Sequence, residues 1–296
     1  MAQIREIKKR MVAVRTIQRI TKTMQMIATA KFTAALQRSK ATRPYTGRIR
    51  ALVAEVAAAA GDVTNPLLGH RSSGASGGKT GHQRDVLLVV TSDRGLCGAY
   101  NGSVLRTAMA EIRKRRGTSR ESILETSGKK AAAFFRFQRM EVAHKHTFGD
   151  KPSFEAVAAL ADRYMADYIA GRVDAVFVTY MRFISNARQV PEVMQLLPLA
   201  LPAAGAAAGP APVYEFRPDA EAILNDLLPR SVRVSLFQAM NDAVVSENVM
   251  RMVAMKAATD NAGGLGRTLK RNYNRARQAR ITTELTEIIS GAAALE

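Results

Sequence analysis

The chain opens with MAQIREIKKRMVAVRTIQRITKTMQMI, residues 1–27, a basic stretch that contains neither proline nor glycine. Its apolar residues recur at helical spacing, at Ile4, Ile7, Met11, Val14, Ile17, Ile20, Met24 and Ile27. Seven steps cover 23 residues, so the mean step is about 3.3 residues, shorter than the 3.6 residues of a straight helical turn. A stripe with that drift winds left-handedly around a neighbour, and this segment is predicted to be one helix of a coiled coil.

The other end of the chain has the same character. No proline follows Pro229, so the last segment can also run as one long helix. Its apolar residues again return at intervals of three and four, at Leu236, Met240, Val244, Leu265, Leu269, Tyr273, Ala276, Ile281, Leu285 and Ile288. We expect the two ends to pair as a hairpin-like antiparallel coiled coil.

Positive charge is concentrated on the predicted helices. The 296 residues carry a formal net charge of +19. Residues 1–50 hold thirteen Lys or Arg against one acid, Glu6, a net of +12, and residues 251–296 hold eight against four, a net of +4. Like charges on two helices that must pair cost stability, which favours an external acidic partner: nucleic acid, anionic lipid or an acidic protein surface.

Between the ends the pattern changes to that of a small α/β domain. Residues 85–91, DVLLVVT, form a continuous apolar run typical of a strand buried on both faces. Further strands are expected at 122–125, 173–183 and 190–198, and helices at 102–116, 129–139 and 154–170. The predicted fold class is α+β, a long antiparallel coiled coil of N- and C-terminal helices with an inserted α/β domain whose sheet is mostly parallel.

Composition sets the domain boundaries. We assign the N-terminal coiled-coil helix to 1–60, a Gly- and Ser-rich linker to 61–84, the α/β domain to 85–200, an Ala-, Gly- and Pro-rich linker to 201–217, and the C-terminal helix to 218–296. No apolar run approaches 20 residues, and the first residues resemble neither a secretory signal nor a transit peptide. The single cysteine, Cys97, excludes internal disulfides and fits a reducing compartment.

Several candidate chemical motifs are weak. SGASGGKT, residues 73–80, is one residue short of a phosphate-binding loop and precedes a strand instead of following one. The turn at 93–98, DRGLCG, lacks dinucleotide-loop spacing and is interpreted as structural. His144 and His146 have no neighbouring cysteine or carboxylate pair to complete a metal site. No nucleophile, base and acid constellation emerges, so we predict no catalytic residue, cofactor or metal, and a chain that is not itself an enzyme.

Specific motifs at both ends and in the centre carry a family resemblance. They are RITKTMQM at 19–26, TSDRGLCGAYN at 91–101, RMVAMKAATDN at 251–261, YNRARQARIT at 273–282 and TELTEIISGAAAL at 283–295. In order and separation they resemble the gamma subunit of F-type ATP synthase, the central rotary stalk. Residues 60–84 and 117–215 are similar to that family only in general layout.

The resemblance implies a function and a set of partners. The coiled coil would stand inside a hexamer of alternating alpha (noncatalytic) and beta (catalytic) subunits, and the α/β domain would sit on the membrane c-ring beside the epsilon subunit. Rotation driven by proton flow would carry each catalytic site through open, loose and tight states, so driving ATP synthesis, or hydrolysis in reverse. It also implies no nucleic-acid partner, no transmembrane span and peripheral attachment to the cytoplasmic side of a bacterial membrane.

Contact residues follow from the same motifs. Lys22, Met24 and Arg251 resemble positions near the acidic lever segment of the catalytic subunit. Gln278 and Thr282, with Arg277, resemble the upper contact with catalytic-subunit loops. The apolar tip, residues 288–295, resembles the end that turns in an apolar sleeve.

Two other classes of protein remain to be tested. A basic coiled-coil nucleic-acid binder would explain the charge, although aromatic residues make up only 6% of the chain. An α/β enzyme with helical extensions would need a polar cluster at the strand ends, which the sequence does not contain.

Glycines near the C-terminal end predict a soft stretch of helix. Gly263, Gly264 and Gly266 lie close together, and each helix-interior glycine costs roughly 1 kcal/mol relative to alanine. We expect amide hydrogen exchange at residues 263–267 to be faster than in the flanking turns. Exchange as slow there as in those turns would contradict the prediction.

Overall fold

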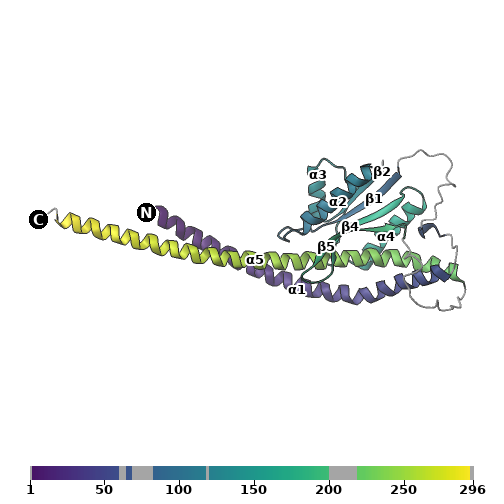
Figure 1. Ribbon diagram of the computed structural model, residues 1–296, viewed down its shortest axis with the longest axis horizontal. Helices are drawn as coiled ribbons and strands as arrows, with labels where there is room; N and C mark the ends of the chain where they lie inside the picture. The colour runs from purple at the N-terminus through teal and green to yellow at the C-terminus, as the bar shows by residue number, and fades with distance from the viewer. Residues whose placement is uncertain (1, 60–64, 69–82, 118–119, 200–218, 294–296) are drawn as a thin grey trace. The chain divides into compact units, whose positions relative to one another are not determined.

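The computed structural model describes residues 2–59, 65–68, 83–117, 120–199 and 219–293. The chain forms two compact units. One comprises Met1–Ala30 and Arg251–Glu296 (the terminal unit), and the other comprises Lys31–Met250 (the central unit). Two long helices belong to both units, α1 (Ala2–Ala59) and α5 (Ala220–Ala293), as Figure 1 shows. These compactness boundaries lie inside the helices, whereas composition placed the domain boundaries in the segments that connect them. Most of the linker at 61–84, including residues 73–80, and all of that at 201–217 lie outside the described residues.

In the terminal unit, α1 buries a strict heptad. The half-buried and buried positions are Ile4, Ile7, Met11, Val14, Gln18, Thr21, Gln25 and Ala28. Their steps alternate between three and four residues, which is the 3.5-residue period of a left-handed coiled coil. The coiled-coil prediction therefore holds, but the seam predicted at 17, 20, 24 and 27 was wrong.

The error has a physical cause. Ile17, Ile20 and Ile27 are 52%, 48% and 52% exposed, and Met24 is 37% exposed. The buried heptad continues through the polar residues Gln18, Thr21 and Gln25. The residues one position earlier are apolar, so hydrophobicity indicated them as the seam instead. The mean step of about 3.3 residues arose from joining two stripes that lie on different faces of one helix.

Contacts between the two helices define their register in the terminal unit. Thr259 Oγ1 donates to Thr21 Oγ1 at 2.8 Å. A Cβ on Gly263 would lie 3.0 Å from Gln18 Nε2, and one on Gly266 would lie 3.9 Å from Val14 Cγ1. Contacts further along α1 in sequence involve residues that come earlier on α5, so the two helices are antiparallel. Gly263 and Gly266 lie on the side of α5 that faces α1, and α5 is helical without interruption through all three glycines.

Part of the seam predicted on α5 is correct. Leu269, Tyr273 and Ala276 are half-buried, as expected, but Leu265 is 51% exposed. Beyond Ala276, every described position on α5 is exposed, including Ile281, Leu285 and Ile288. The register explains this change, because Ala276 lies opposite Ile4 and the last turns of α5 run past the start of α1.

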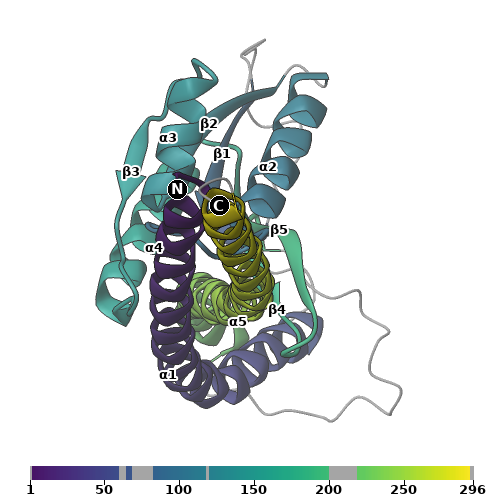
Figure 2. The same cartoon turned by 90° about the vertical axis from the view of Figure 1, so that its left-hand side faces the viewer.

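The central unit holds one five-stranded sheet, seen with its flanking helices in Figure 2, in the order β3-β2-β1-β4-β5. The strands are β1 (Gln83–Val90), β2 (Arg120–Ser127), β3 (His144–His146), β4 (Ala175–Phe183) and β5 (Gln189–Leu197). Only the β4–β5 pair is antiparallel, which confirms a mostly parallel sheet. The helices α2 (Tyr100–Gly117), α3 (Lys129–Phe137) and α4 (Phe154–Ile169) lie close to the predicted positions, whereas the short helix η1 (Pro66–Leu68) falls in the segment assigned as a linker.

Alternate residues of β1 supply the two faces of the core. Val86, Leu88 and Val90 pack with residues of α1, α4 and α5, whereas Leu87 and Val89 pack with residues of α2 and α3. Layers on both faces explain why residues 86–90 are apolar at every position. The helices α1 and α5 therefore complete the core of the α/β domain.

Both long helices contain a proline. α1 runs through Pro44, and α5 begins nine residues before Pro229. The helices assigned to 1–60 and 218–296 therefore each extend through a proline. Burial against the sheet, by Ile49 and Val53 on α1 and by Leu224 and Leu228 on α5, offsets the local cost of the ring.

Gly128, between β2 and α3, is predicted to resist substitution. Its φ is +96°, and an added Cβ would lie 2.1 Å from the carbonyl oxygen of Thr91. Gly128→Ala is expected to lower the free energy of unfolding by roughly 2–4 kcal/mol in chemical denaturation, through backbone strain and overlap. Gly102→Ala in α2, where a Cβ would meet nothing within 4 Å, serves as the control and is expected to raise it slightly. Equal effects of the two substitutions would contradict this account.

Candidate partner-binding surface

The carboxyl ends of β1 and β2 leave little room for a ligand. Parallel α/β sheets bind ligands at the carboxyl ends of their strands. Here the cavity at the ends of β1 and β2 measures about 30 Å³, and α5 lines it with Met240, Ala243 and Glu247. That volume is about the share of one water molecule in liquid. At the carboxyl ends of β1 and β2, helix α5 therefore fills the place of the usual ligand crevice.

The turn after β1 is held by internal hydrogen bonds. Asn101 accepts from the Ser92 backbone N–H at 3.0 Å and donates to Ser92 Oγ at 2.8 Å and to Cys97 Sγ at 3.2 Å. Cys97 is 2% exposed. Leu96 and Gly98 both have a positive φ, of 62° and 59°. These contacts are what a structural turn requires.

Of the two histidines on β3, His146 contacts a carboxylate, that of Glu125. Glu125 Oε2 lies 2.7 Å from His146 Nε2, accepts from Tyr164 at 2.8 Å, and pairs with Arg163. Burial alone would raise the pKa of Glu125, but these hydrogen bonds and the Arg163 charge outweigh it and hold the pKa below its usual value. Burial and the Glu125 charge raise the pKa of Tyr164 well above its usual value. In the described parts of the chain, no three His, Cys, Asp or Glu side chains gather in a way that could hold a metal ion.

The surface of the terminal unit carries exposed apolar and basic residues in a regular pattern along α1. On α1, the residue before each of the last four seam positions is apolar: Ile17, Ile20, Met24 and Ile27. The residue after a seam position is usually basic: Arg5, Lys8, Arg15, Arg19 and Lys22. All nine side chains are exposed. Because one residue turns a helix by about 100°, these sets form an apolar flank and a basic flank on opposite sides of the seam.

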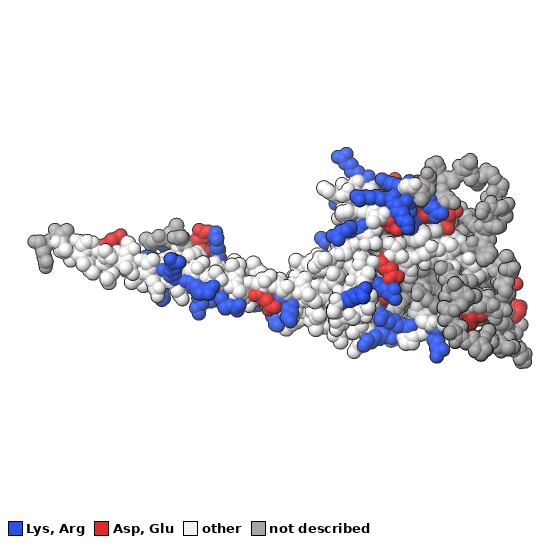
Figure 3. All heavy atoms as spheres, viewed as in Figure 1, with Lys and Arg blue, Asp and Glu red and all other residues white. Residues whose placement is uncertain are grey.

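α5 adds positive charge to the same unit. Between Asp260 and Glu284 the sequence has no acid and six basic residues, namely Arg267, Lys270, Arg271, Arg275, Arg277 and Arg280. The register set by Thr21 and Thr259 places the stretch from Arg267 to Arg275 beside the stretch from Arg5 to Ala13 of α1. Figure 3 shows Lys and Arg along the terminal helices with few acidic side chains among them. Among the described residues, Glu6 pairs with Arg10 and Glu284 pairs with Arg280, so the acids of these helices neutralise only part of the basic band.

The six predicted contact residues fall into two groups. Lys22 and Met24 are exposed on α1, on the basic and the apolar flank respectively, and Arg251 is half-buried on α5. The register places Arg251 opposite Thr29, within two turns of Met24. The second group, Arg277, Gln278 and Thr282, is exposed on the part of α5 that continues beyond the Ile4 pairing.

Residues missed by the sequence interpretation lie on the apolar flank. Ile17, Ile20 and Ile27 had been placed in the seam, yet they face outward beside Met24. Strict heptad counting from Ile4 through Gln18, Thr21 and Gln25 would have identified them as surface residues.

Known proteins are similar to this chain in sequence and in fold. A family model described as ATP synthase matches residues 3–295. The ATP synthase gamma chain of Rhodopirellula baltica is 40% identical over 303 residues, which cover 100% of each chain. A chain of the Euglena gracilis mitochondrial ATP synthase rotor in rotational state 1 has a TM-score of 0.62 at 18% identity, over 95% of this chain and 99% of that one. A chain of the same organism's OSCP/F1/c-ring assembly in rotational state 3 has a TM-score of 0.65 at 18% identity, over 99% of this chain and 95% of that one.

The Glu125 network makes acid stability testable. A carboxyl whose pKa is lowered by folding contributes stability above its unfolded pKa, and the contribution is lost as pH falls through the folded value. Glu125→Gln is expected to cost roughly 3 kcal/mol at neutral pH, because Arg163 loses its charged partner, and to flatten the decline in stability as pH falls below the usual pKa range of glutamate. Glu121→Gln, on the same strand with a 58% exposed side chain, is the control and should cost little. A variant that retains the wild-type pH profile of unfolding would refute this role.

Proposed function

Because this chain belongs to the family of ATP synthase gamma chains, we propose that its paired terminal helices turn inside the ring of alternating alpha and beta subunits and so transmit rotation to the catalytic sites. The chain is a noncatalytic subunit of an enzyme complex. The complex makes ATP from ADP and phosphate at the expense of a proton gradient, while this subunit carries mechanical work between the membrane ring and those sites.

The observation that carries the proposal is the unequal surface of the terminal unit. One flank of α1 is apolar, the other is basic, and α5 closes the third side. A shaft with unlike flanks cannot contact equivalent surrounding subunits in the same way at any one moment. A conformational bias can be no larger than the difference in contact free energy that causes it. The two flanks supply such a difference, and rotation would pass it from one catalytic site to the next.

Residue roles follow from charge and exposure. Lys22 and Arg251 would meet carboxylates of the catalytic subunit's lever segment, while Met24, with Ile17 and Ile20, would present the apolar flank. Arg277, Gln278 and Thr282 would contact catalytic-subunit loops from the unpaired part of α5. Thr282 Oγ1 donates to the Gln278 backbone oxygen at 3.1 Å, and the Gln278 side chain is exposed. Further along, Ile281, Leu285 and Ile288 form an exposed apolar set suited to turning in an apolar sleeve.

The central unit would face the membrane ring and the epsilon subunit. In Euglena gracilis, a chain of this fold is present in the rotor of the mitochondrial ATP synthase and in its OSCP/F1/c-ring assembly. None of the helices described for this chain has the length and apolarity needed to cross a bilayer. We propose peripheral attachment at the cytoplasmic face of a bacterial membrane, through the ring and not through lipid.

Co-expression with the alpha and beta subunits tests this function directly. A tagged chain is expected to recover both subunits in an ATP-hydrolysing complex. A chain that remains a monomer and binds DNA tightly, with an affinity that falls steeply as salt rises, would reject the stalk function in favour of nucleic-acid binding.

The same preparation tests the contact residues. The triple variant Arg277→Ala, Gln278→Ala, Thr282→Ala is expected to lower ATP hydrolysis by the complex about tenfold, through lost charge-assisted hydrogen bonds. Thermal unfolding of the chain should barely change, since all three side chains are exposed. Arg172→Ala removes a 63% exposed guanidinium from the central unit and is the matched control. Wild-type hydrolysis by the triple variant would remove these residues from the contact surface.

A further inference from the structure

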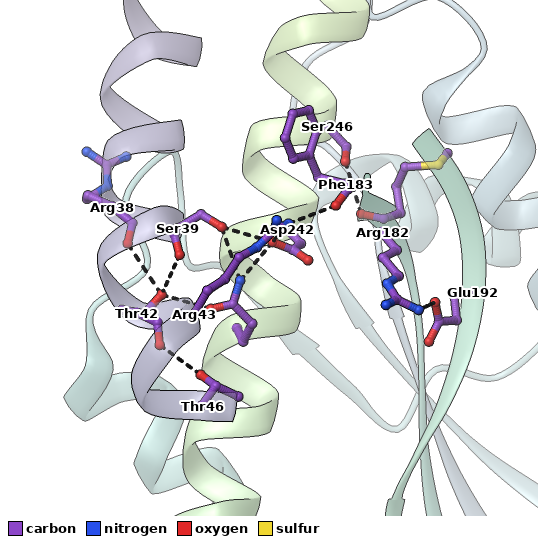
Figure 4. Close-up of polar contacts among 12 residues, drawn as sticks. Arg38, Ser39, Thr42, Arg43, Thr46, Arg182, Phe183, Glu192, Asp242 and Ser246 are labelled. Carbon is purple, nitrogen blue, oxygen red and sulfur yellow. Dashed lines mark hydrogen bonds and ion pairs between the residues drawn. The ribbon is translucent and has the colours of Figure 1, made fainter. Parts of the chain in front are cut away.

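A polar cluster interrupts the apolar packing between α1 and α5 in the central unit. Asp242 Oδ1 accepts from Ser39 Oγ at 3.0 Å, from Gln238 Nε2 at 2.8 Å and from Arg43 Nη2 at 3.2 Å. Thr42 Oγ1 donates to Gln238 Oε1 at 2.8 Å. Figure 4 shows Arg43 extending from α1 toward Asp242 on α5. Five side chains from two helices thus converge on one another.

The cluster also includes the sheet. Arg43 Nη2 donates to the carbonyl oxygen of Phe183, at the end of β4, at 2.8 Å, and its guanidinium lies 5.8 Å from the centre of the Phe183 ring. Two residues earlier on β4, the carbonyl oxygen of Met181 accepts from Ser246 Oγ at 3.1 Å. Both helices are therefore tied to the same strand end, α1 by Arg43 and α5 by Ser246.

Burial makes these contacts obligatory. Ser39 is fully buried and the Asp242 side chain is 8% exposed, whereas the Arg43 side chain is 40% exposed and borders a cavity of about 690 Å³. A buried carboxylate without a partner is strongly unfavourable. Displacing α1 along α5 would remove Ser39, Thr42 and Arg43 from Asp242 together.

Apolar seams on either side of the cluster are more permissive. Phe32 and Ala35 precede it on α1, and Ile49, Val53 and Val56 follow it. Such residues recur at heptad spacing and can be repacked one heptad away, while a buried polar group accepts only the alignment that satisfies it. In the terminal unit the seam is weaker still, because Gln18, Thr21 and Gln25 occupy it.

The cluster coincides with a break in the hydrogen bonding of α1. Pro44 lies inside the helix directly after Arg43, and it removes one backbone donor. At this point the hydroxyl of Thr46 donates to the backbone oxygen of Thr42 at 3.1 Å. Contacts to α5 and β4 hold α1 where its own ladder is interrupted.

We propose that Arg43 and Asp242 are positioning residues that fix the axial alignment of α1 against α5 and anchor it to β4. The inference rests on the proposed rotary function, because a shaft transmits torque only if its two helices do not slide past each other under load. These residues touch no reacting group; they act by holding the helices that do contact the catalytic subunits.

Engineered cysteine pairs measure the alignment in the isolated full-length chain. Thr21 and Thr259 touch in the native register, so Thr21→Cys with Thr259→Cys should form a disulfide on mild oxidation. A slip of one heptad in either direction would instead bring residue 21 opposite Met252 or Gly266, and pairs with cysteine at those positions report it. Cys97 is buried and remains as an internal control.

Arg43→Met and Asp242→Asn are expected to raise the ratio of slipped to native disulfide about tenfold, because each removes one partner of a buried ion pair. Asp242→Asn keeps an oxygen acceptor for Ser39 and Gln238. If Arg43→Met does not fold, this variant alone tests whether the ion pair sets the alignment. Arg230→Met, which removes a 53% exposed guanidinium paired with Asp226 on α5, is the matched control and should leave the ratio unchanged. Wild-type ratios in both test variants would overturn the proposal.

A second readout uses the assembled complex. The variants should retain ATP hydrolysis while the protons pumped per ATP hydrolysed fall at least about threefold, a separation that simple loss of stability would not produce. Wild-type pumping per ATP in both variants would also overturn the inference. If the wild-type chain fails to assemble with alpha and beta subunits, the proposed rotary function fails, while the disulfide ratios still test the alignment.

Discussion

The rest of the structure depends on the antiparallel seam between α1 and α5. In the terminal unit the seam residues of α1 from Gln18 to Ala28 are small or polar, Thr21 is bonded to Thr259, and Gly263 and Gly266 face α1. Such a seam contributes little apolar burial per turn. In the central unit the same helices bury Ile49, Val53, Leu224 and Leu228 against the sheet. Stability of the helix pair is therefore concentrated where the sheet supports it.

This distribution leaves the outer surface of the terminal unit free for contact. A seam that uses Gln18 and Thr21 places Ile17 and Ile20 on the surface, where burial against other subunits can stabilise an assembly. The basic band has the same effect, since Arg267 and Lys270 lie in register with basic residues of α1 and repel them. Neutralisation by carboxylates of a partner would relieve that repulsion. The helix pair is therefore less stable in isolation than it would be when bound to its partners.

Much of the α/β domain could be predicted from the sequence. The strand at 85–91 was identified because a strand covered on both faces is apolar almost throughout, and the helices at 102–116, 129–139 and 154–170 because they alternate with such runs. The seam could not be located by the same method. Hydrophobicity marks any apolar stripe, and on α1 the outward stripe through Ile20 and Ile27 is more apolar than the seam beside it.

The sequence by itself determined that two long helices flank a mostly parallel α/β domain, and its motifs identified the family, because helical periodicity, buried-strand composition and motif order are local properties of the chain. Only the tertiary structure decided which stripe of α1 is buried, that α5 fills the crevice at the strand ends, and that Arg43 meets Asp242 and the Phe183 carbonyl. These features depend on register, and register is set by contacts between residues about two hundred positions apart, which no local pattern encodes.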